Sequence, residues 1–575
     1  MPGTRVADLL VETLVTAGVR RIHGVAGDSL NAITDSIRAR RDIVWAPVRH
    51  EESAAFAAGA EAQLTGRLAV CAGSCGPGNL HLINGLFDAH RSRAPVLAIA
   101  AQIPSPEIGS GYFQETHPDQ LFRECSHYAE LVSQPEQMPR VLEIAMRTAV
   151  SREGVAVIAL PGDVALRPAT AGPSGLRLPE LRPRVRPSDA DLARLAELLA
   201  GATRVTILAG AGCAGAHDAL LSLADRLQAP IVHTLRGKEW VEYSNPHDVG
   251  MTGLLGFSSG YHALESADLV LLLGTDFPYR QFYPTSATLV QVDLRGEQIG
   301  RRVPVHFGVV GDVGESVAAL LPLVTPKRDD RHLRAALADY AKAREGLDAL
   351  ATEGSASSKI HPQYVARLLD RLAKPDAIFA CDVGTPTVWA ARYLTMNGQR
   401  RLLGSFNHAS MANALPQAIG AQLAFPDRQV IAMSGDGGLA MLLGDLLTLR
   451  QLDLPVKIVV FKNDSLAFVN LEMEAAGFVP YATDLKNPNF AAIATGAGLL
   501  GLSATTPDQV QPALRQALDH PGPALVEVAV DRQEIVLPPT LDLDLVRKFG
   551  LFVVRAVFSG RGDEVVDLAK TSLLR

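Results

Sequence analysis

The chain has 575 residues, 47% hydrophobic and 20% charged, a balance that predicts a globular protein and excludes a disordered one. At roughly 100–200 residues per domain, this length predicts about three to five domains. The 54 lysines and arginines stand against 61 acidic residues, for a net charge of −7. Because no overall cationic field exists to hold a phosphate backbone, we expect no nucleic-acid partner.

The start of the chain and its cysteines indicate a compartment. The opening MPGTRVADLLVETLV has an acidic residue at Asp8 and lacks the charged-then-apolar order of an export signal, so we expect an intracellular protein. An odd number of cysteines in a long chain favours reduced thiols over a disulfide framework. Cys71 and Cys75 form a CxxxC pair, but no second pair completes a zinc set, which favours a structural role. The five cysteines are Cys71, Cys75, Cys125, Cys213 and Cys381.

Short apolar runs alternate with helical patterns along the chain, and this alternation is typical of parallel sheets. It predicts three α/β domains, each a doubly wound parallel sheet, over residues 1–183, 184–337 and 338–533, followed by a tail over 534–575. The Pro-rich stretch 176–189 reads as a linker between the first two blocks. The expected strands are, in chain order, 21–27, 43–49, 68–73, 95–101, 204–210, 230–235, 269–274, 288–294, 376–382, 429–435, 456–462 and 523–530.

The first and third blocks resemble each other. Segments 51–78 and 410–438 share an Ala-rich helix, a Gly-Ala pair, a strand and a glycine turn, which suggests duplication. Twin domains can clamp a cofactor between the carboxyl ends of their strands.

The strongest chemical signal is SGDGG at 434–438, which follows one expected strand, with Asn463 after the next expected strand, 27 residues beyond Asp436. Neighbouring parallel strands would place Asp436 and Asn463 side by side as oxygen ligands of a Mg²⁺-like ion, while the glycines expose N–H groups to a diphosphate. Alone, the GDG sequence would more often be a simple tight turn, and the downstream Asn463 and the resemblance between the first and third blocks favour the metal site instead.

This spacing resembles the thiamine-diphosphate enzymes, whose signature is GDG followed by Asn. The resemblance implies Mg²⁺ ligation by Asp436, Asn463 and the backbone carbonyl of Ser465. The sequence departs from the family pattern at Lys462 and Ala467, which leaves the local loop geometry open. The residues that the resemblance places at thiamine diphosphate are Glu51, Ala409, Ser410, Met411, Asp436, Gly437, Gly438, Asn463, Asp464, Ser465, Leu466, Ala467, Phe468 and Val469.

Glu51 is the catalytic residue that the resemblance implies. It would face the aminopyrimidine ring from the other domain and protonate a ring nitrogen, which promotes loss of the thiamine C2 proton. Without the family position, a Glu at a helix start would read as a dipole-favoured surface residue. Met411 would act as the wedge that holds the cofactor bent, although a lone Met on a helix is more often core.

The middle block contains GAGCAG at 210–215, formally a G-x-G-x-x-G motif. No acidic residue ends the next strand, so we reject a nicotinamide cofactor. In flavin-bearing relatives this block holds FAD, and the resemblance implies FAD contacts at Thr252, Gly253, Leu254, Leu255, Thr275, Asp276, Phe277, Pro278, Tyr279 and Asp293.

The resemblance also implies a small apolar substrate pocket, which favours a methyl keto acid such as pyruvate. Its residues would be Phe113, Gln114, Val383 and Phe468, with Phe468 as a mobile catalytic residue between thiamine and flavin. Taken singly, each aromatic would more often belong to the core.

The tail carries amphipathic segments at 545–558 and 559–575, too short and too charged to cross a bilayer. An ordinary helix docked on its own protein fits the pattern as well. Across the whole chain, the sequence is similar to the bacterial quinone-linked pyruvate oxidases, in which the tail binds phospholipid.

That resemblance implies oxidative decarboxylation of pyruvate to acetate and CO₂, with electrons passing through FAD to ubiquinone. The expected protein is a homotetramer, peripheral on the cytoplasmic face of the inner membrane. Two alternatives remain open: an acetolactate-synthase-like ligase with FAD as a relic, and a non-catalytic lipid-binding homologue.

Overall fold

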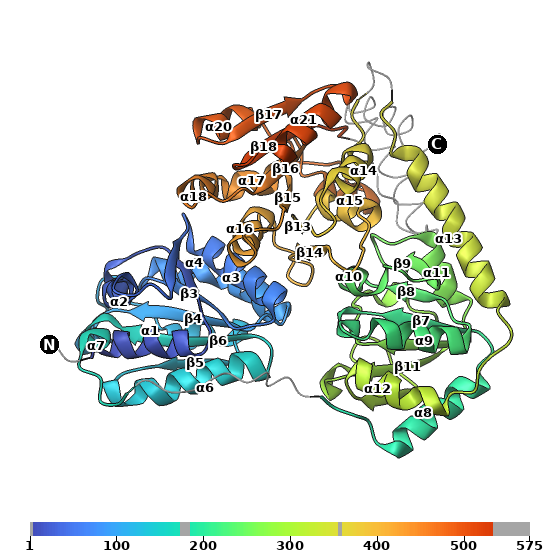
Figure 1. The fold of residues 1–575 in the computed structure, drawn as a ribbon, viewed down its shortest axis with the longest axis horizontal. Helices are drawn as coiled ribbons and strands as arrows, with labels where there is room; N and C mark the ends of the chain where they lie inside the picture. The colour runs from blue at the N-terminus through green and yellow to red at the C-terminus, as the bar shows by residue number, and fades with distance from the viewer. Residues whose placement is uncertain (1–3, 173–183, 355–358, 533–575) are drawn as a thin grey trace.

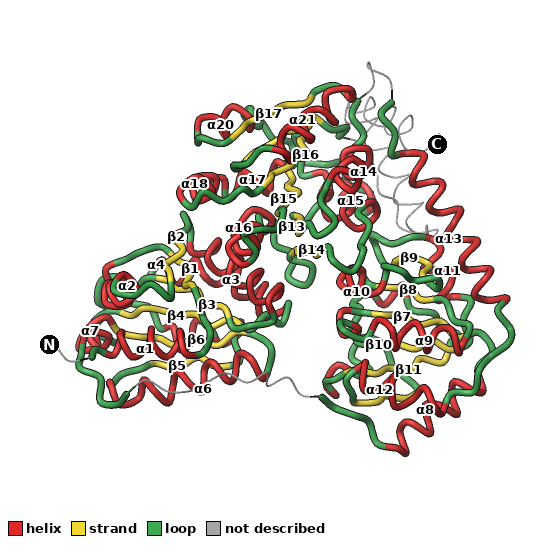
Figure 2. Tube along the Cα trace, in the orientation of Figure 1, coloured by secondary structure: helices red, strands yellow, loops and turns green. Residues whose placement is uncertain are grey.

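The computed structural model describes residues 4–172, 184–354 and 359–532, and they form three six-stranded sheets (Figure 1). Every strand pairing in the three sheets is parallel. Helices and strands alternate along the chain in each part (Figure 2). The predicted α/β class with three parallel sheets is confirmed.

The N-terminal sheet has the strand order β2-β1-β3-β4-β6-β5. Alternate residues of one strand face opposite layers: Val70 and Ala72 join a core with α1, α2 and α6, whereas Cys71 joins a core with α3 and α4. Both faces of the sheet are therefore covered by helices. The elements are α1 (Val6–Thr16), β1 (Arg21–Gly24), α2 (Asn31–Arg38), β2 (Val44–Pro47), α3 (Glu51–Thr65), β3 (Ala69–Gly73), α4 (Pro77–Arg91), β4 (Val96–Gln102), α5 (Pro118–Leu121), β5 (Tyr128–Leu131), α6 (Met138–Ser151), β6 (Val155–Pro161) and α7 (Gly162–Leu166).

The C-terminal sheet has the order β14-β13-β15-β16-β18-β17, which repeats the N-terminal order strand for strand. This common topology agrees with the predicted duplication. The sequence patterns had not singled out the inner strand β6 or the outer strands β5, β14 and β17, nor β9 (Asp248–Met251) and β12 (Phe307–Val310) at the edges of the middle sheet. The elements are α14 (Pro362–Leu372), β13 (Ile378–Cys381), α15 (Thr385–Tyr393), β14 (Arg401–Gly404), α16 (Ala414–Ala424), β15 (Val430–Gly435), α17 (Asp436–Met441), α18 (Leu446–Gln451), β16 (Lys457–Lys462), α19 (Ala467–Ala475), α20 (Phe490–Gly496), β17 (Leu500–Ala504), α21 (Pro507–Asp519) and β18 (Ala524–Ala529).

The middle sheet differs from the twins, with the order β12-β11-β10-β7-β8-β9. Counted from its own first strand this is the 3-2-1-4-5-6 order of dinucleotide-binding folds, whose strand order reverses between β7 and β10. The elements are α8 (Asp189–Gly201), β7 (Val205–Ala209), α9 (His217–Leu227), β8 (Ile231–His233), α10 (Lys238–Val241), β9 (Asp248–Met251), α11 (Ser258–Glu265), β10 (Leu269–Leu273), β11 (Thr288–Asp293), β12 (Phe307–Val310), α12 (Val313–Leu320) and α13 (Arg331–Leu350).

The twin domains meet through α3 and α16, which lie next to each other in Figure 1. Ala57, Ala60 and Leu64 of α3 belong to the same core as Ala414 and Ala418 of α16. At the crossing, a Cβ added to Gly420 would lie 2.1 Å from the backbone oxygen of Ala57, so only glycine allows this approach.

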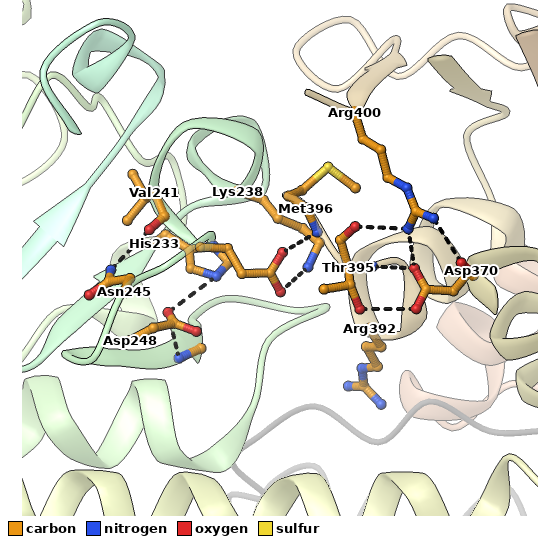
Figure 3. A network of polar contacts seen from close by, with 12 residues as sticks. His233, Lys238, Val241, Asn245, Asp248, Asp370, Arg392, Thr395, Met396 and Arg400 are labelled. Carbon is orange, nitrogen blue, oxygen red and sulfur yellow. Dashed lines mark hydrogen bonds and ion pairs between the residues drawn. The ribbon is translucent and has the colours of Figure 1, made fainter. Parts of the chain in front are cut away.

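A buried polar network joins the middle domain to the C-terminal domain (Figure 3). The Lys238 ammonium, 2% exposed, pairs with Glu242 at 2.6 Å, and the other Glu242 oxygen accepts from the Met396 backbone N–H at 3.0 Å. On the C-terminal side, Arg400 pairs with Asp370 at 2.6 Å. The charged groups are thus paired, as burial requires.

All five cysteines are buried and free of disulfides. Within the described ranges, no helix combines the length and apolar character needed to span a membrane. The predicted membrane-binding tail, 534–575, lies outside the described residues.

Candidate active site

The carboxyl edge of the C-terminal sheet holds Asp436, the first residue of α17 directly after β15. Its side chain is 2% exposed. One oxygen accepts from the backbone N–H groups of Asn463 at 3.1 Å and Asp464 at 2.6 Å; the other accepts from Gly437 at 2.9 Å. Burial raises the pKa of Asp436, and these N–H groups counteract the shift.

The loop after β16 brings the three predicted metal residues together. Asn463 directly follows β16, which pairs with β15, and its side-chain oxygen accepts from the Ser465 N–H at 3.1 Å. Asp464 has a φ of +53°, which turns the chain sharply back toward Asp436. The group therefore offers a carboxylate, an amide oxygen and backbone carbonyls, the oxygen ligands that Mg²⁺ prefers. Their role as ligands stays a prediction.

A strained loop precedes α16 beside this turn. Ala409 and Ala412, which flank Ser410 and Met411, have φ values of +63° and +65°. Such backbone conformations cost about 1–3 kcal/mol each for residues other than glycine and gather at functional sites. The Met411 Cε atom lies 3.5 Å from the Cβ position of Gly437, so the predicted wedge lies against the GDG turn.

Glu51 is the first residue of α3 and is 7% exposed. Its Oε2 is 2.9 Å from Nδ1 of His81 on α4. Its Oε1 points toward Gly78, where a Cβ would lie 2.9 Å from Oε1 and 2.6 Å from the Ser74 hydroxyl. The glycine at the start of α4 thus allows its backbone to approach Glu51 closely.

Glu51 and the Asp436 loop are not joined directly within one chain. Among the residues that the structure describes, no hydrogen bond or ion pair joins Glu51 to the Asp436 loop. The halves are linked indirectly, because Asn84 on α4 donates to Glu52 at 2.7 Å and to the Ser410 hydroxyl at 2.8 Å.

The predicted substrate residues are spread over both halves. Gln114, with φ of +63°, lies against Gly76 and accepts from the Cys75 thiol at 3.3 Å, whereas Phe113 is 76% exposed. Val383 follows β13 and donates its N–H to Asn413 at 3.3 Å. Phe468 lies on α19 and packs against the core of the C-terminal domain.

The predicted flavin residues gather at the carboxyl edge of the middle sheet, after β9, β10 and β11. Gly253 has a φ of +99°, and a Cβ atom added to it would lie 2.9 Å from the ring of Phe277. Asp293 is 4% exposed and accepts from the Arg295 N–H at 3.0 Å; burial raises the pKa of its carboxyl to about 6. The buried Thr252 hydroxyl and Arg295 Nη2 have no hydrogen-bond partner.

The glycines of GAGCAG have a structural explanation at the point where the strand order reverses. Cβ atoms on Gly210 and Gly212 would lie 2.5 Å and 2.7 Å from backbone atoms of Gly274, after β10. Close approach of two backbone turns therefore accounts for this motif without a bound nicotinamide.

Sequence reasoning missed three residues that shape these sites. Asn487 donates to Asp436 at 2.9 Å, and Asn84 and His81 surround Glu51 and Ser410. Asn487 follows Asp436 by 51 residues with no motif. His81 and Asn84 lie one helical turn apart on a helix that starts in the glycine turn beside Glu51, which was a usable signal.

Models of the thiamine pyrophosphate enzymes match all three parts of the chain: the N-terminal TPP binding domain at residues 4–121, the central domain at 192–320 and the C-terminal TPP binding domain at 382–528. The putative thiamine pyrophosphate-containing protein YdaP of Bacillus subtilis is 36% identical over 98% of each chain. The chain belongs to the thiamine pyrophosphate enzymes. The predicted thiamine diphosphate domains are thereby confirmed, and Mg²⁺ is typical of this family.

Relatives with named activities fall into two groups. The pyruvate oxidase of Lactiplantibacillus plantarum is 30% identical over 93% of this chain and 90% of its own. The large subunit of acetolactate synthase from Parasynechococcus marenigrum is 32% identical over 92% of this chain and 88% of its own. Identity alone therefore does not separate an oxidase from a ligase within the family.

Proposed function

We propose that this thiamine pyrophosphate enzyme oxidatively decarboxylates pyruvate and passes the two electrons through FAD to ubiquinone. Pyruvate, water and ubiquinone would give acetate, CO₂ and ubiquinol. Two features that occur together in this chain carry the proposal. One is the loop of oxygen ligands around Asp436. The other is the carboxyl edge of the middle sheet, which carries polar side chains and whose strands follow the order of dinucleotide-binding folds. Full-length similarity to a protein named pyruvate oxidase supports it.

The Asp436 loop fits a Mg²⁺–diphosphate group. Among the described residues, Asp436 forms no ion pair, so its buried carboxylate lacks a cation. Asp436, Asn463 and the Ser465 carbonyl would hold Mg²⁺, and the turn at Gly437 and Gly438 would lie against the diphosphate. When bound, thiamine diphosphate supplies a nucleophilic carbon that attacks the carbonyl of a 2-oxo acid.

Glu51 would hold and return a proton at the aminopyrimidine ring. Its Oε1 faces the backbone of Gly78, and its low exposure keeps water from competing for the carboxylate. Met411 would support the bent cofactor from the strained loop 409–412. The positions of Phe113 and Phe468 fit walls of an apolar pocket once both halves of the site meet.

FAD is proposed for the middle-sheet edge. Two polar atoms there, the Thr252 hydroxyl and Arg295 Nη2, are buried without partners, which is costly unless a ligand satisfies them. A hydroxyl and a guanidinium suit the diphosphate and ribose of a dinucleotide. Asp293 at the end of β11 would accept hydrogen bonds from the ribose.

A homo-oligomer, proposed as a tetramer, would bring Glu51 of one copy to the Asp436 loop of another. Large apolar side chains beside both halves are exposed, including Phe113 at 76%, Met441 at 63%, Phe478 at 58% and Tyr481 at 84%, and they suit a covered interface. The amphipathic pattern of the tail supports a peripheral place on phospholipid at the cytoplasmic face of the inner membrane.

The second candidate is an acetolactate-synthase-like ligase, favoured by the similarity reported above. A non-catalytic lipid-binding homologue is disfavoured, because the chain keeps Asp436, Asn463 and Glu51 in ordered, hydrogen-bonded positions.

One assay separates these functions. Protein loaded with thiamine diphosphate, Mg²⁺ and FAD is mixed anaerobically with pyruvate, and flavin bleaching, ubiquinone-analogue reduction, acetate and acetolactate are measured. Bleaching with acetate supports the proposal, and acetolactate without quinone reduction supports the ligase. Glu51→Gln should keep the flavin and lose about 100-fold or more in turnover. Truncation after residue 550 should abolish liposome binding, and a truncated chain that still binds would refute the lipid role of the tail.

A further inference from the structure

The surroundings of Glu51 contain two histidines that the proposed reaction has not yet used. Nδ1 of His81 lies 2.9 Å from Glu51 Oε2. The His81 side chain is 43% exposed, whereas that of Glu51 is 9% exposed. His81 is therefore a polar contact of the catalytic candidate that reaches solvent. Among the described residues, it is also the hydrogen-bond partner of that carboxylate.

The ring of His81 is fixed by stacking on His50. The two ring centroids are 4.3 Å apart, with an angle of 24° between the planes. His50 is in turn held in place, because its Nδ1 accepts from the Glu52 backbone N–H at 3.2 Å and so caps α3. Two elements thus orient one imidazole: the cap of α3 and the first turns of α4.

This arrangement decides which carboxylate oxygen is free. With His81 donating to Oε2, Oε1 faces Gly78 and forms no hydrogen bond among the described residues. An ionised carboxylate requires a donor, so Nδ1 must carry the hydrogen in that state. Without the donor, the side chain of Glu51 would rotate about χ3 and lose its fixed direction.

We propose that His81, stacked on His50, is a positioning residue that holds the Glu51 carboxylate toward the aminopyrimidine ring of thiamine diphosphate. This rests on the proposed role of Glu51, but not on pyruvate or quinone as substrates. His81 does not take part in bond breaking; it acts through the orientation of Glu51.

The test compares His81→Ala, which removes the donor, with His81→Asn, whose Nδ2 can occupy the place of Nδ1. Protein loaded with thiamine diphosphate and Mg²⁺ is transferred to D₂O without substrate, quenched in acid, and exchange at the thiamine C2 position is followed by NMR. We expect His81→Ala to slow exchange by roughly 10- to 100-fold and His81→Asn to stay within about threefold of wild type. Glu51→Gln sets the slow limit.

A second readout separates positioning from a general structural role. Affinity for thiamine diphosphate, measured by quenching of tryptophan fluorescence, should change by less than about threefold in His81→Ala, because His81 would not contact the cofactor. Wild-type exchange in His81→Ala, or equally slow exchange in His81→Asn, would overturn the proposal. So would a loss of affinity that accounts for the whole effect in His81→Ala. If Glu51→Gln itself exchanges at the wild-type rate, the proposed function of Glu51 fails instead.

Discussion

The crossing of α3 and α16 makes a quantitative prediction for Gly420→Ala. The added Cβ would lie 2.1 Å from the Ala57 oxygen and 2.7 Å from its carbonyl carbon and Cα atoms. Non-bonded atoms prefer about 3.5–4.0 Å, so the helices would have to separate by roughly 1 Å or more. The obstacle is backbone, and no rotamer change can relieve it.

The expected size follows from two opposing effects. Overpacking of a tight core typically costs about 1–3 kcal/mol, and a rigid backbone obstacle belongs at the upper end. Alanine gains about 1 kcal/mol over glycine in a helix interior. The net loss in unfolding free energy is therefore about 2 kcal/mol. Because α3 begins at Glu51, the displacement should also weaken the proposed catalytic alignment.

A matched control is present in α13. Gly346 is exposed in the helix interior, and a Cβ there meets nothing within 4 Å. Gly346→Ala should stabilise the chain by about 0.5–1 kcal/mol. Urea unfolding is followed by tryptophan fluorescence, for which each domain carries one reporter: Trp45, Trp240 and Trp389. If Gly420→Ala proves as stable as Gly346→Ala, the inferred close crossing is wrong.

The remaining predictions concern a buried carboxyl and the proposed metal ligand. Burial, and next the nearby Glu242 charge, raise the pKa of Asp248 from 3.8 to about 7. The protonated Asp248 therefore contributes its full stabilisation below about pH 4, and this contribution is lost as pH rises toward 7. Asp248→Asn should reduce the pH dependence of the unfolding free energy by up to about 1.4 kcal/mol per pH unit in this range. An unchanged dependence of the unfolding free energy on pH would contradict this. Asp436→Ala should weaken Mg²⁺-dependent thiamine diphosphate binding by roughly 100-fold or more, as measured by titration calorimetry. The control Asp453→Asn, on an exposed turn, should bind thiamine diphosphate like the wild type. Normal binding by Asp436→Ala would show that Asp436 is not a metal ligand.

The sequence by itself determined the α/β architecture and the chemistry at the carboxyl edge of the C-terminal sheet. Buried parallel strands are continuous apolar runs, so the inner strands of the three sheets were predictable from their residues, although the equally apolar inner strand β6 was not singled out. The similarity of the N-terminal and C-terminal domains was predictable because both keep an Ala-rich helix before a strand and a glycine turn. The Asp436–Asn463 pair was predictable because neighbouring parallel strands end at the same edge of a sheet.

Tertiary structure decided what depends on contacts between distant segments. The outer strands β5, β9, β12, β14 and β17 pair on one side only, and their short sequence patterns did not mark them as strands. The contacts of Asn487 with Asp436 and of Asn84 with Ser410 join segments 51 and 326 residues apart, and no sequence spacing encodes them. The same holds for Gly420, whose need for glycine arises only where a second helix crosses it. Local patterns specify elements, whereas the orientation of a catalytic side chain is set by neighbours that only folding brings together.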